Sequence, residues 1–233
     1  MIDSLPTYIH WIFGLTTLLT IFLFFKASGN SWLALGIILL LLFIQAVTGL
    51  AGFYTVTDVT PPHFLLLVLP PLLIIITLFL VPKGRTILDR LDQRWLTWLH
   101  SVRIPVELVL FWLFLHKQVP QLMTFEGRNF DIAAGLTAPL IAYFGYHKKR
   151  LNRGILLTWN FICLGLLFNI VINAILSAPF PFQRFAFDQP NVAILYFPFV
   201  WLPGCIVPLV LLAHLATIRQ LILSGNKKRQ VDR

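Results

Sequence analysis

The chain contains 233 residues, of which 58% are apolar and only 12% are charged, against about 25% charged residues in a typical soluble domain. Its mean hydropathy of +0.83 leaves too few polar side chains to cover a water-facing surface. This composition excludes an ordinary soluble globular protein and indicates a polytopic membrane protein. The net charge of +9 does not indicate a nucleic-acid partner, because the cations lie in short segments between apolar runs.

Seven apolar stretches are long enough to cross a bilayer as helices. They cover residues 7–25, 32–54, 63–81, 95–116, 131–146, 155–177 and 192–215. Continuous apolar runs favour helices over a membrane barrel, whose strands alternate in polarity. The sequence therefore predicts one all-α domain over residues 1–233, with seven transmembrane helices in the lipid bilayer of a plasma or inner membrane.

The Lys and Arg residues lie mostly on one side of this arrangement. Fourteen of the 18 fall after the first, third, fifth and seventh stretches, including residues 227–229 of the C-terminal tail, which we expect near anionic lipid. Only Lys117, Arg128 and Arg184 fall in the alternate segments. Because cytoplasmic loops are enriched in Lys and Arg, this asymmetry predicts an outside N-terminus and a cytoplasmic C-terminus.

The segment before the fourth stretch is amphipathic. Ile87, Leu88, Leu91 and Trp95 recur at helical spacing with charged residues between them. This pattern predicts either a helix on the inner membrane surface or a plain extension of the fourth helix into water.

Three ionisable residues share one face of the fourth helix. His100, Arg103 and Glu107 are spaced i, i+3 and i+7. A charge at the bilayer centre costs about 2.5–3.5 kcal/mol on insertion scales, so such residues mark functional sites by default. Arg103 and Glu107 are four residues apart and are predicted to pair with each other, a pairing that could equally serve only to fix helix packing.

Partners for this face are predicted on later helices. Asn169 and Asn173 lie one turn apart on the sixth helix, and Asn160 lies on its opposite face. Asparagines also hold membrane helices together without any further role. His214, near the inner end of the seventh helix, is placed to face His100.

Ionisable residues also gather toward the outer side. Five of them are predicted to line a mouth open to the outside: His63, Glu126, Arg128, Asp131 and Arg184. Asp131 is expected to be the N-cap of the fifth helix. An interfacial aromatic belt with loop ion pairs accounts for the same pattern.

The sequence predicts neither a metal site nor a cofactor. No two of His10, His63 and His116 have ligand spacing, and Cys163 and Cys205 lie inside apolar runs. A Gly-rich phosphate loop and an HExxH motif are both missing from the sequence.

Three functions fit these features. The protein binds or transports a small molecule or proton at the fourth helix, where Arg103 would hold an anion or Glu107 would exchange a proton. Alternatively, it is a membrane-embedded enzyme acting on a lipid or isoprenoid, with Glu107 or His100 as acid or base. In the third case it is an accessory subunit whose polar face points outward to another membrane protein.

Overall fold

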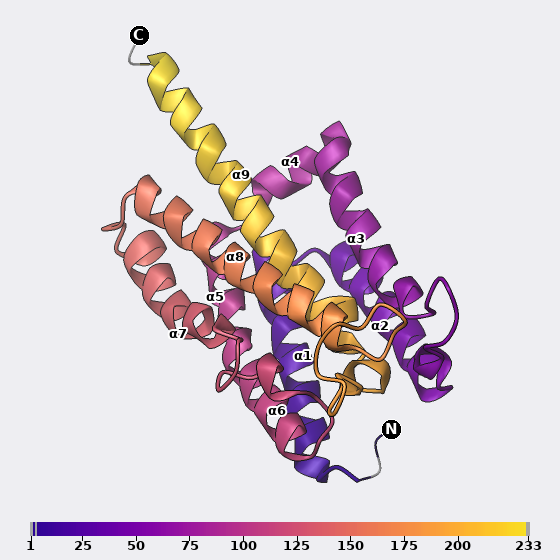
Figure 1. Cartoon of the computed structure of the whole chain (residues 1–233). Coiled ribbons are helices and arrows are strands. Elements are labelled where there is room, and N and C mark those ends of the chain that lie inside the picture. The colour runs from indigo at the N-terminus through magenta and orange to yellow at the C-terminus, as the bar shows by residue number, and fades with distance from the viewer. Residues whose placement is uncertain (1, 3, 232–233) are drawn as a thin grey trace.

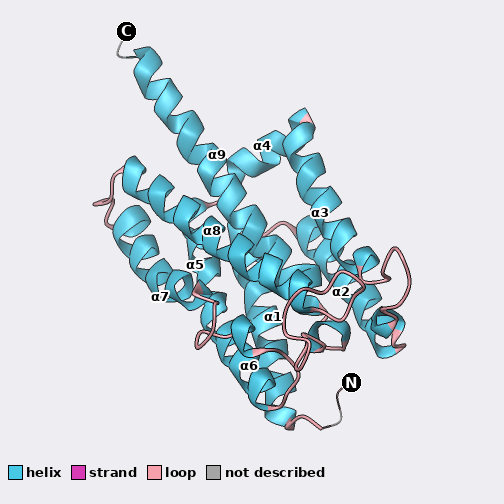
Figure 2. Ribbon diagram, viewed as in Figure 1, coloured by secondary structure: helices cyan, strands magenta, loops and turns pink. Residues whose placement is uncertain are grey.

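The computed structural model describes residues 2 and 4–231, and only the backbone of residues 226–231. The basic side chains predicted at residues 227–229 therefore lie outside the described part. Figure 2 shows helices joined by loops, with no strand among the described residues. The α-helices are α1 (Thr7–Ala27), α2 (Trp32–Leu50), α3 (Leu65–Leu80), α4 (Pro82–Arg90), α5 (Gln93–Leu99), α6 (Arg103–Leu115), α7 (Asp131–Ile141), α8 (Arg153–Ser177) and α9 (Val207–Val231).

Short segments of altered pitch continue or join these helices. Three of them extend a longer helix, namely the 3₁₀ turn η2 (His100–Val102) and the π-helical η4 (Ala142–His147) and η6 (Leu202–Ile206). The others are single 3₁₀ turns in loops: η1 (Phe53–Thr55), η3 (Gln121–Met123) and η5 (Ala193–Leu195).

Five helices of the described chain are long and apolar enough to cross a membrane. They are Thr7–Ala27, Trp32–Leu50, Gln93–Leu115, Arg153–Ser177 and Leu202–Gly225, and the bent pair of α3 and α4 would make six. The all-helical class is thus confirmed, and these helices are compatible with a membrane protein.

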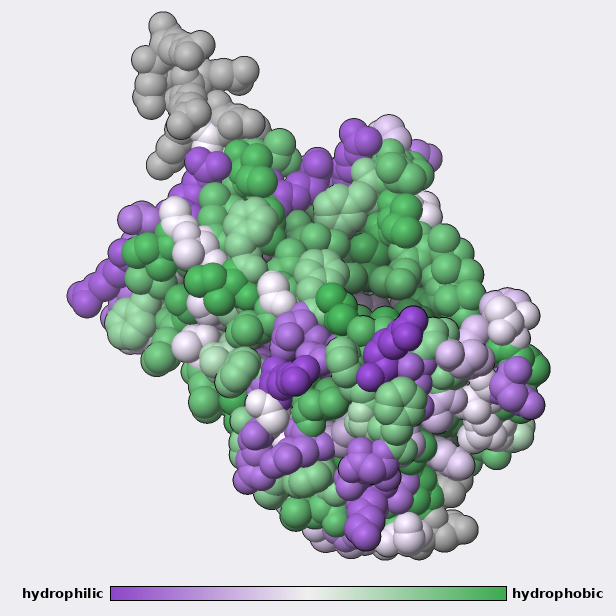
Figure 3. Space-filling model, in the orientation of Figure 1, coloured by the Kyte–Doolittle hydropathy of each residue, from purple (hydrophilic) through white to green (hydrophobic). Residues whose placement is uncertain are grey.

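Apolar side chains occupy both the inside and the outside of the bundle. Phe13, Leu96 and Phe199 are fully buried in the core, whereas Trp32 and Phe43 on α2 are 76% and 68% exposed. Figure 3 shows hydrophobic residues over much of the visible face. A surface of this kind is unfavourable in water and suits a lipid environment.

The last long helix begins later than the sequence predicts. Residues 192–200 form η5 and turns, the π-helical η6 starts only at Leu202, and α9 follows from Val207. Pro198 lacks an N–H group and restricts the residue before it, which disfavours a helix there. Ile194 and Phe199 are nevertheless buried. Hydropathy alone does not distinguish such a buried apolar loop from a helix.

Helix α4 lies across the end of the bundle, bent 97° from α3 (Figure 1). Arg219 of α9 forms a paired contact with Asp89 at 2.9 and 3.0 Å. The neighbouring Gln220 Nε2 donates to the carbonyl oxygens of Leu88 and Leu91. Ile87 and Leu88 of the amphipathic segment thus lie in a separate helix, α4, which α9 holds in place. The chain breaks at Leu91 and Asp92, and Trp95 lies in α5.

A glycine lets α7 pack closely against the start of α6. A Cβ atom added to Gly135 would lie 2.9 Å from Ile104 Cγ1 and 3.0 Å from the Ile104 backbone nitrogen. Real Cβ atoms essentially never approach other atoms closer than 3.0 Å. The small residue therefore brings the start of α7 beside Arg103.

We expect Gly135→Leu to destabilise the bundle by about 1–3 kcal/mol, because the added side chain has no room. Gly165→Leu is the matched control, since a Cβ at Gly165 meets no atom within 4 Å. Thermal unfolding of both variants in detergent micelles measures the difference. Equal shifts of the unfolding midpoint would contradict close packing at Gly135.

Candidate functional site

The polar face of the predicted fourth span, which α5, η2 and α6 form, points into packed protein. His100, Arg103 and Glu107 are 1%, 3% and 2% exposed. The 3₁₀ turn η2 separates α5 from α6, and Ser101 Oγ of this turn donates to the Trp98 carbonyl of α5 at 2.7 Å. A proline in the first turn of a helix is tolerated, and Pro105 occupies that part of α6.

Arg103, the first residue of α6, connects that helix to three others. Its Nη1 donates to Asp131 Oδ1 of α7 at 2.7 Å and to the carbonyl oxygen of Cys163 of α8 at 3.3 Å. Its Nη2 lies 2.9 Å from His214 Nε2 of α9. Arg103 thus pairs with Asp131. The pairing of Arg103 with Glu107, which the i, i+4 spacing predicts, is wrong. The N-terminal end of α7 favours a carboxylate, since the helix dipole is positive there.

The contact with Arg103 fixes the tautomer of His214. A guanidinium group only donates hydrogen bonds, so His214 Nε2 must accept. The ring proton is then on Nδ1, which lies 3.0 Å from Asn160 Oδ1 and donates to it. Asn160 in turn donates through Nδ2 to the carbonyl of Leu156 at 2.9 Å.

Two histidines stack beside the guanidinium group. The rings of His100 and His214 have centroids 3.8 Å apart and an interplanar angle of 18°. Trp159 packs edge-on against His100 at 5.5 Å. The sequence-based expectation that His100 and His214 face each other agrees with this geometry.

Asn129 links Glu107 to Asp131. Its Nδ2 donates to Glu107 Oε1 and to the carbonyl of Met123, and its Oδ1 accepts from the Asp131 backbone N–H at 3.0 Å. Asn129 lies in the loop before α7, where helical periodicity gives no signal, so the sequence does not reveal this role. We name the whole set the Arg103 cluster, which comprises His100, Arg103, Glu107, Asn129, Asp131, Asn160 and His214.

Three buried polar atoms of the Arg103 cluster make no hydrogen bond with the described residues. They are Glu107 Oε2, His100 Nδ1 and Arg103 Nε. An unpartnered buried polar atom costs about 1–3 kcal/mol, and such atoms are expected at sites that hold water, a proton or a ligand.

One protein family matches a large part of the chain. Its description is "Domain of unknown function (DUF8737)", and the match covers residues 61–222. The chain belongs to this family. Every residue of the Arg103 cluster lies inside the matched region, whereas α1 and α2 precede it. No curated protein and no solved structure matches the chain.

Asn169 and Asn173 do not join the Arg103 cluster. Asn169 Nδ2 donates to the backbone carbonyl of Arg128 at 2.8 Å. Asn173 Nδ2 donates to the Asn169 carbonyl at 2.9 Å. The side chain that α8 supplies to the cluster is instead Asn160, on the opposite face of that helix.

The five residues predicted to line an outer mouth differ in burial and in their place in the fold. Asp131 is 6% exposed and belongs to the Arg103 cluster, and it is the first residue of α7, with Phe130 at the N-cap position. His63 Nδ1 lies 3.1 Å from the carbonyl oxygen of Phe53. Glu126 and Arg128 are exposed in the loop before α7. The fifth residue, Arg184, lies in the loop after α8.

We expect Asp131→Asn to destabilise the protein by about 3–5 kcal/mol, because it leaves the buried guanidinium of Arg103 without a counter-charge. Asp89→Asn is the matched control, since the Asp89 side chain is 37% exposed in its ion pair with Arg219, and an exposed pair contributes about 0–1 kcal/mol. Unfolding in detergent micelles measures both. Similar losses from the two variants would contradict a structural dependence on the buried pair.

Proposed function

We propose that this protein is an integral membrane protein that binds or transports a small molecule or proton at the Arg103 cluster, and that the species is a proton. The proposal rests on the charge balance of the cluster. One guanidinium group, that of Arg103, lies among two buried carboxyl groups, those of Asp131 and Glu107.

The charge balance leaves one carboxyl group for the proton. Arg103 stays positively charged under all ordinary conditions, and its ion pair with Asp131 accounts for one negative charge. A second uncompensated carboxylate in a low-dielectric interior is costly. One proton on Glu107 makes the set neutral, and Oε2 is the atom free to carry it, because Asn129 donates to Oε1.

The cluster provides neighbouring groups for moving that proton. From Glu107 to His100 the polar face extends seven residues, or about 10 Å along a helix. This is roughly a third of a hydrocarbon core about 30 Å thick. Asn129 reaches Glu107 from the loop before α7, and the stacked histidines lie at the other end of the cluster. Intramembrane relays of carboxyl and imidazole groups commonly carry protons.

The two alternative functions have less support from the geometry. An accessory subunit with an outward polar face does not fit residues that are 1–3% exposed within their own bundle. A lipid-directed enzyme needs a cavity that reaches Glu107. The apolar cavity enclosed by α1, α2, α3, α4 and α9 is lined by other residues and not by Glu107.

We further propose seven spans with the N-terminus outside, in a plasma or inner membrane. In this arrangement, two further segments cross the membrane beside the five long helices. They are α3, and α7 continued through η4. The latter pair runs from Asp131 to His147, about 25 Å at 1.5 Å per residue. The excess of Lys and Arg in alternate segments supports the orientation.

We expect Glu107→Gln to abolish proton movement, because the amide has no exchangeable carboxyl proton. The measurement is the pH change inside proteoliposomes that contain a trapped pH-sensitive dye, driven by a potassium diffusion potential. Glu126→Gln is the matched control, since Glu126 is an exposed loop carboxylate. It should retain the wild-type rate, while Glu107→Gln should fall to the rate of protein-free vesicles.

Infrared difference spectra separate proton binding from proton transport. Between two pH values, the wild type and Glu126→Gln should show the same protonated-carboxyl band from the protein in lipid, and Glu107→Gln should lack it. Wild-type flux together with an unchanged band in the Glu107→Gln variant would remove the proposal.

Labelling of introduced cysteines tests the topology. We expect a membrane-impermeant maleimide to modify Glu126→Cys in intact cells and to modify Arg150→Cys only after lysis, because these positions flank α7 and η4. Cys163 and Cys205 are buried and provide the unlabelled background. Labelling of both positions from one side would show that this segment does not cross, and a reversed pattern would reverse the orientation.

A further inference from the structure

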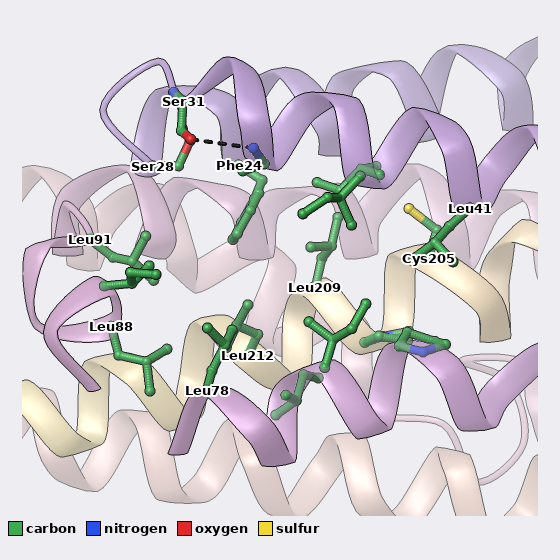
Figure 4. Close-up of a pocket in the computed structure, with 18 of the residues that line it drawn as sticks. Phe24, Ser28, Ser31, Leu41, Leu78, Leu88, Leu91, Cys205, Leu209 and Leu212 are labelled. Atoms are coloured by element: carbon green, nitrogen blue, oxygen red, sulfur yellow. Dashed lines mark hydrogen bonds between the residues drawn. The ribbon is translucent and has the colours of Figure 1, made fainter. Parts of the chain in front are cut away.

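A second candidate site lies away from the Arg103 cluster, in a cavity of about 360 Å³. Helices α1, α2, α3, α4 and α9, with η6, form its walls, and most of its lining is aliphatic. Figure 4 shows Leu78, Leu209 and Leu212 converging on the cavity. Its volume is in the usual range of about 300–1,000 Å³ for ligand pockets.

The cavity is elongated along α2. Its lining follows that region from Ser31 to Leu41, ten residues that correspond to about 15 Å of helix. This length equals half of a hydrocarbon core about 30 Å thick. Figure 4 shows Ser28 and Ser31 toward one end and Leu41 with Cys205 toward the other. The dimensions therefore suit one acyl chain of a single bilayer leaflet.

One end of the cavity is polar. The Asp92 backbone N–H donates to the Ala27 carbonyl at 2.9 Å, which holds the segment after α4 against the end of α1. This contact brings Arg90, an exposed cavity-lining residue in the last turn of α4, to the same end as the serines. Ser31 Oγ accepts from the Ala34 N–H, and its hydroxyl proton has no acceptor among the described residues.

The cavity opens sideways through an apolar surface. Figure 3 shows a hollow below α4, between α3 and α9, surrounded by hydrophobic residues. Ile74, one of the lining residues on α3, is 38% exposed. Helix α4 closes the polar end and is fixed to α9 through the contact between Arg219 and Asp89. In a bilayer, a ligand would therefore reach the cavity directly from the acyl-chain region.

We propose that this cavity binds an anionic amphiphile, with one acyl chain between α2, α3 and α9 and the acidic headgroup at Arg90 and Ser31. The cation at the polar end selects a negative headgroup, since a basic residue near the membrane surface attracts anionic lipid. The chemistry is shared by a free long-chain fatty acid and by an anionic phospholipid. This site is independent of the proton proposed for the Arg103 cluster.

The test uses cis-parinaric acid, a fluorescent fatty acid, with the full chain in detergent micelles. We expect saturable binding that Ile74→Trp weakens at least tenfold by filling the cavity. Leu73→Trp, its matched control, should bind as the wild type does, because Leu73 is 50% exposed on α3 and outside the cavity lining. Equal binding by both tryptophan variants would overturn the proposal.

A second pair of variants tests the headgroup end without touching the core. Arg90→Gln should weaken parinaric acid binding about fivefold, the effect of about 1 kcal/mol for one basic residue. Lys83→Gln removes a charge from the same helix outside the cavity lining and should change nothing. Equal affinity of Arg90→Gln and Lys83→Gln would overturn the assigned headgroup position.

Competition identifies the source of the ligand. Displacement by oleate alone would identify a free fatty acid, and displacement also by phosphatidylglycerol would identify a membrane phospholipid. Both results support an anionic amphiphile. Equal displacement by uncharged monooleoylglycerol would overturn the requirement for a negative headgroup, and binding that does not saturate would overturn the site as a whole.

Discussion

The guanidinium group of Arg103 is buried in an apolar bundle, where its charge is tolerated only if other groups replace the water it has lost. Those groups come from three further helices: the Asp131 carboxylate, the Cys163 carbonyl and the His214 imidazole. A single side chain thereby connects α6, α7, α8 and α9. The same requirement accounts for the small residue at Gly135, because α7 must approach α6 closely for Asp131 to reach the arginine.

The same arrangement brings a second carboxyl group into the interior. Asn129 holds Glu107 through Oε1 and the start of α7 through the Asp131 N–H. The polar groups are thus connected, yet three of their buried atoms stay without a partner among the described residues. A cluster that served stability alone would gain from satisfying these atoms. All three atoms belong to ionisable side chains, which is why they support the proposed proton exchange.

Helix α9 separates two different environments. His214 faces the Arg103 cluster, whereas Leu209 and Leu212 line the apolar cavity. Near the start of this helix, Gln45 Nε2 donates to the carbonyl of Gly204 in the π-helical η6 at 3.0 Å. A Cβ at Gly204 would collide with the Gln45 side chain at 2.6 Å. π-Helical turns are frequent at functional sites, and this one adjoins the cavity.

Much of the helical framework follows from the sequence alone. Apolar runs of spanning length predict helices wherever a long element forms. The i, i+3, i+7 spacing places His100, Arg103 and Glu107 on one face, because that relation depends only on helical geometry. The amphipathic pattern around Leu88 likewise predicts α4. The charge asymmetry yields an orientation, which stays a prediction.

The tertiary structure decided which groups meet. Arg103 pairs with Asp131, 28 residues away, and Asn129 reaches Glu107 from a loop. These contacts depend on distances between helices, which local periodicity does not contain. Hydropathy averages over a window, so it also missed that residues 192–200 are a buried loop rather than the start of a helix. Composition and period determined the elements and their polar faces, and packing between distant segments selected the partners.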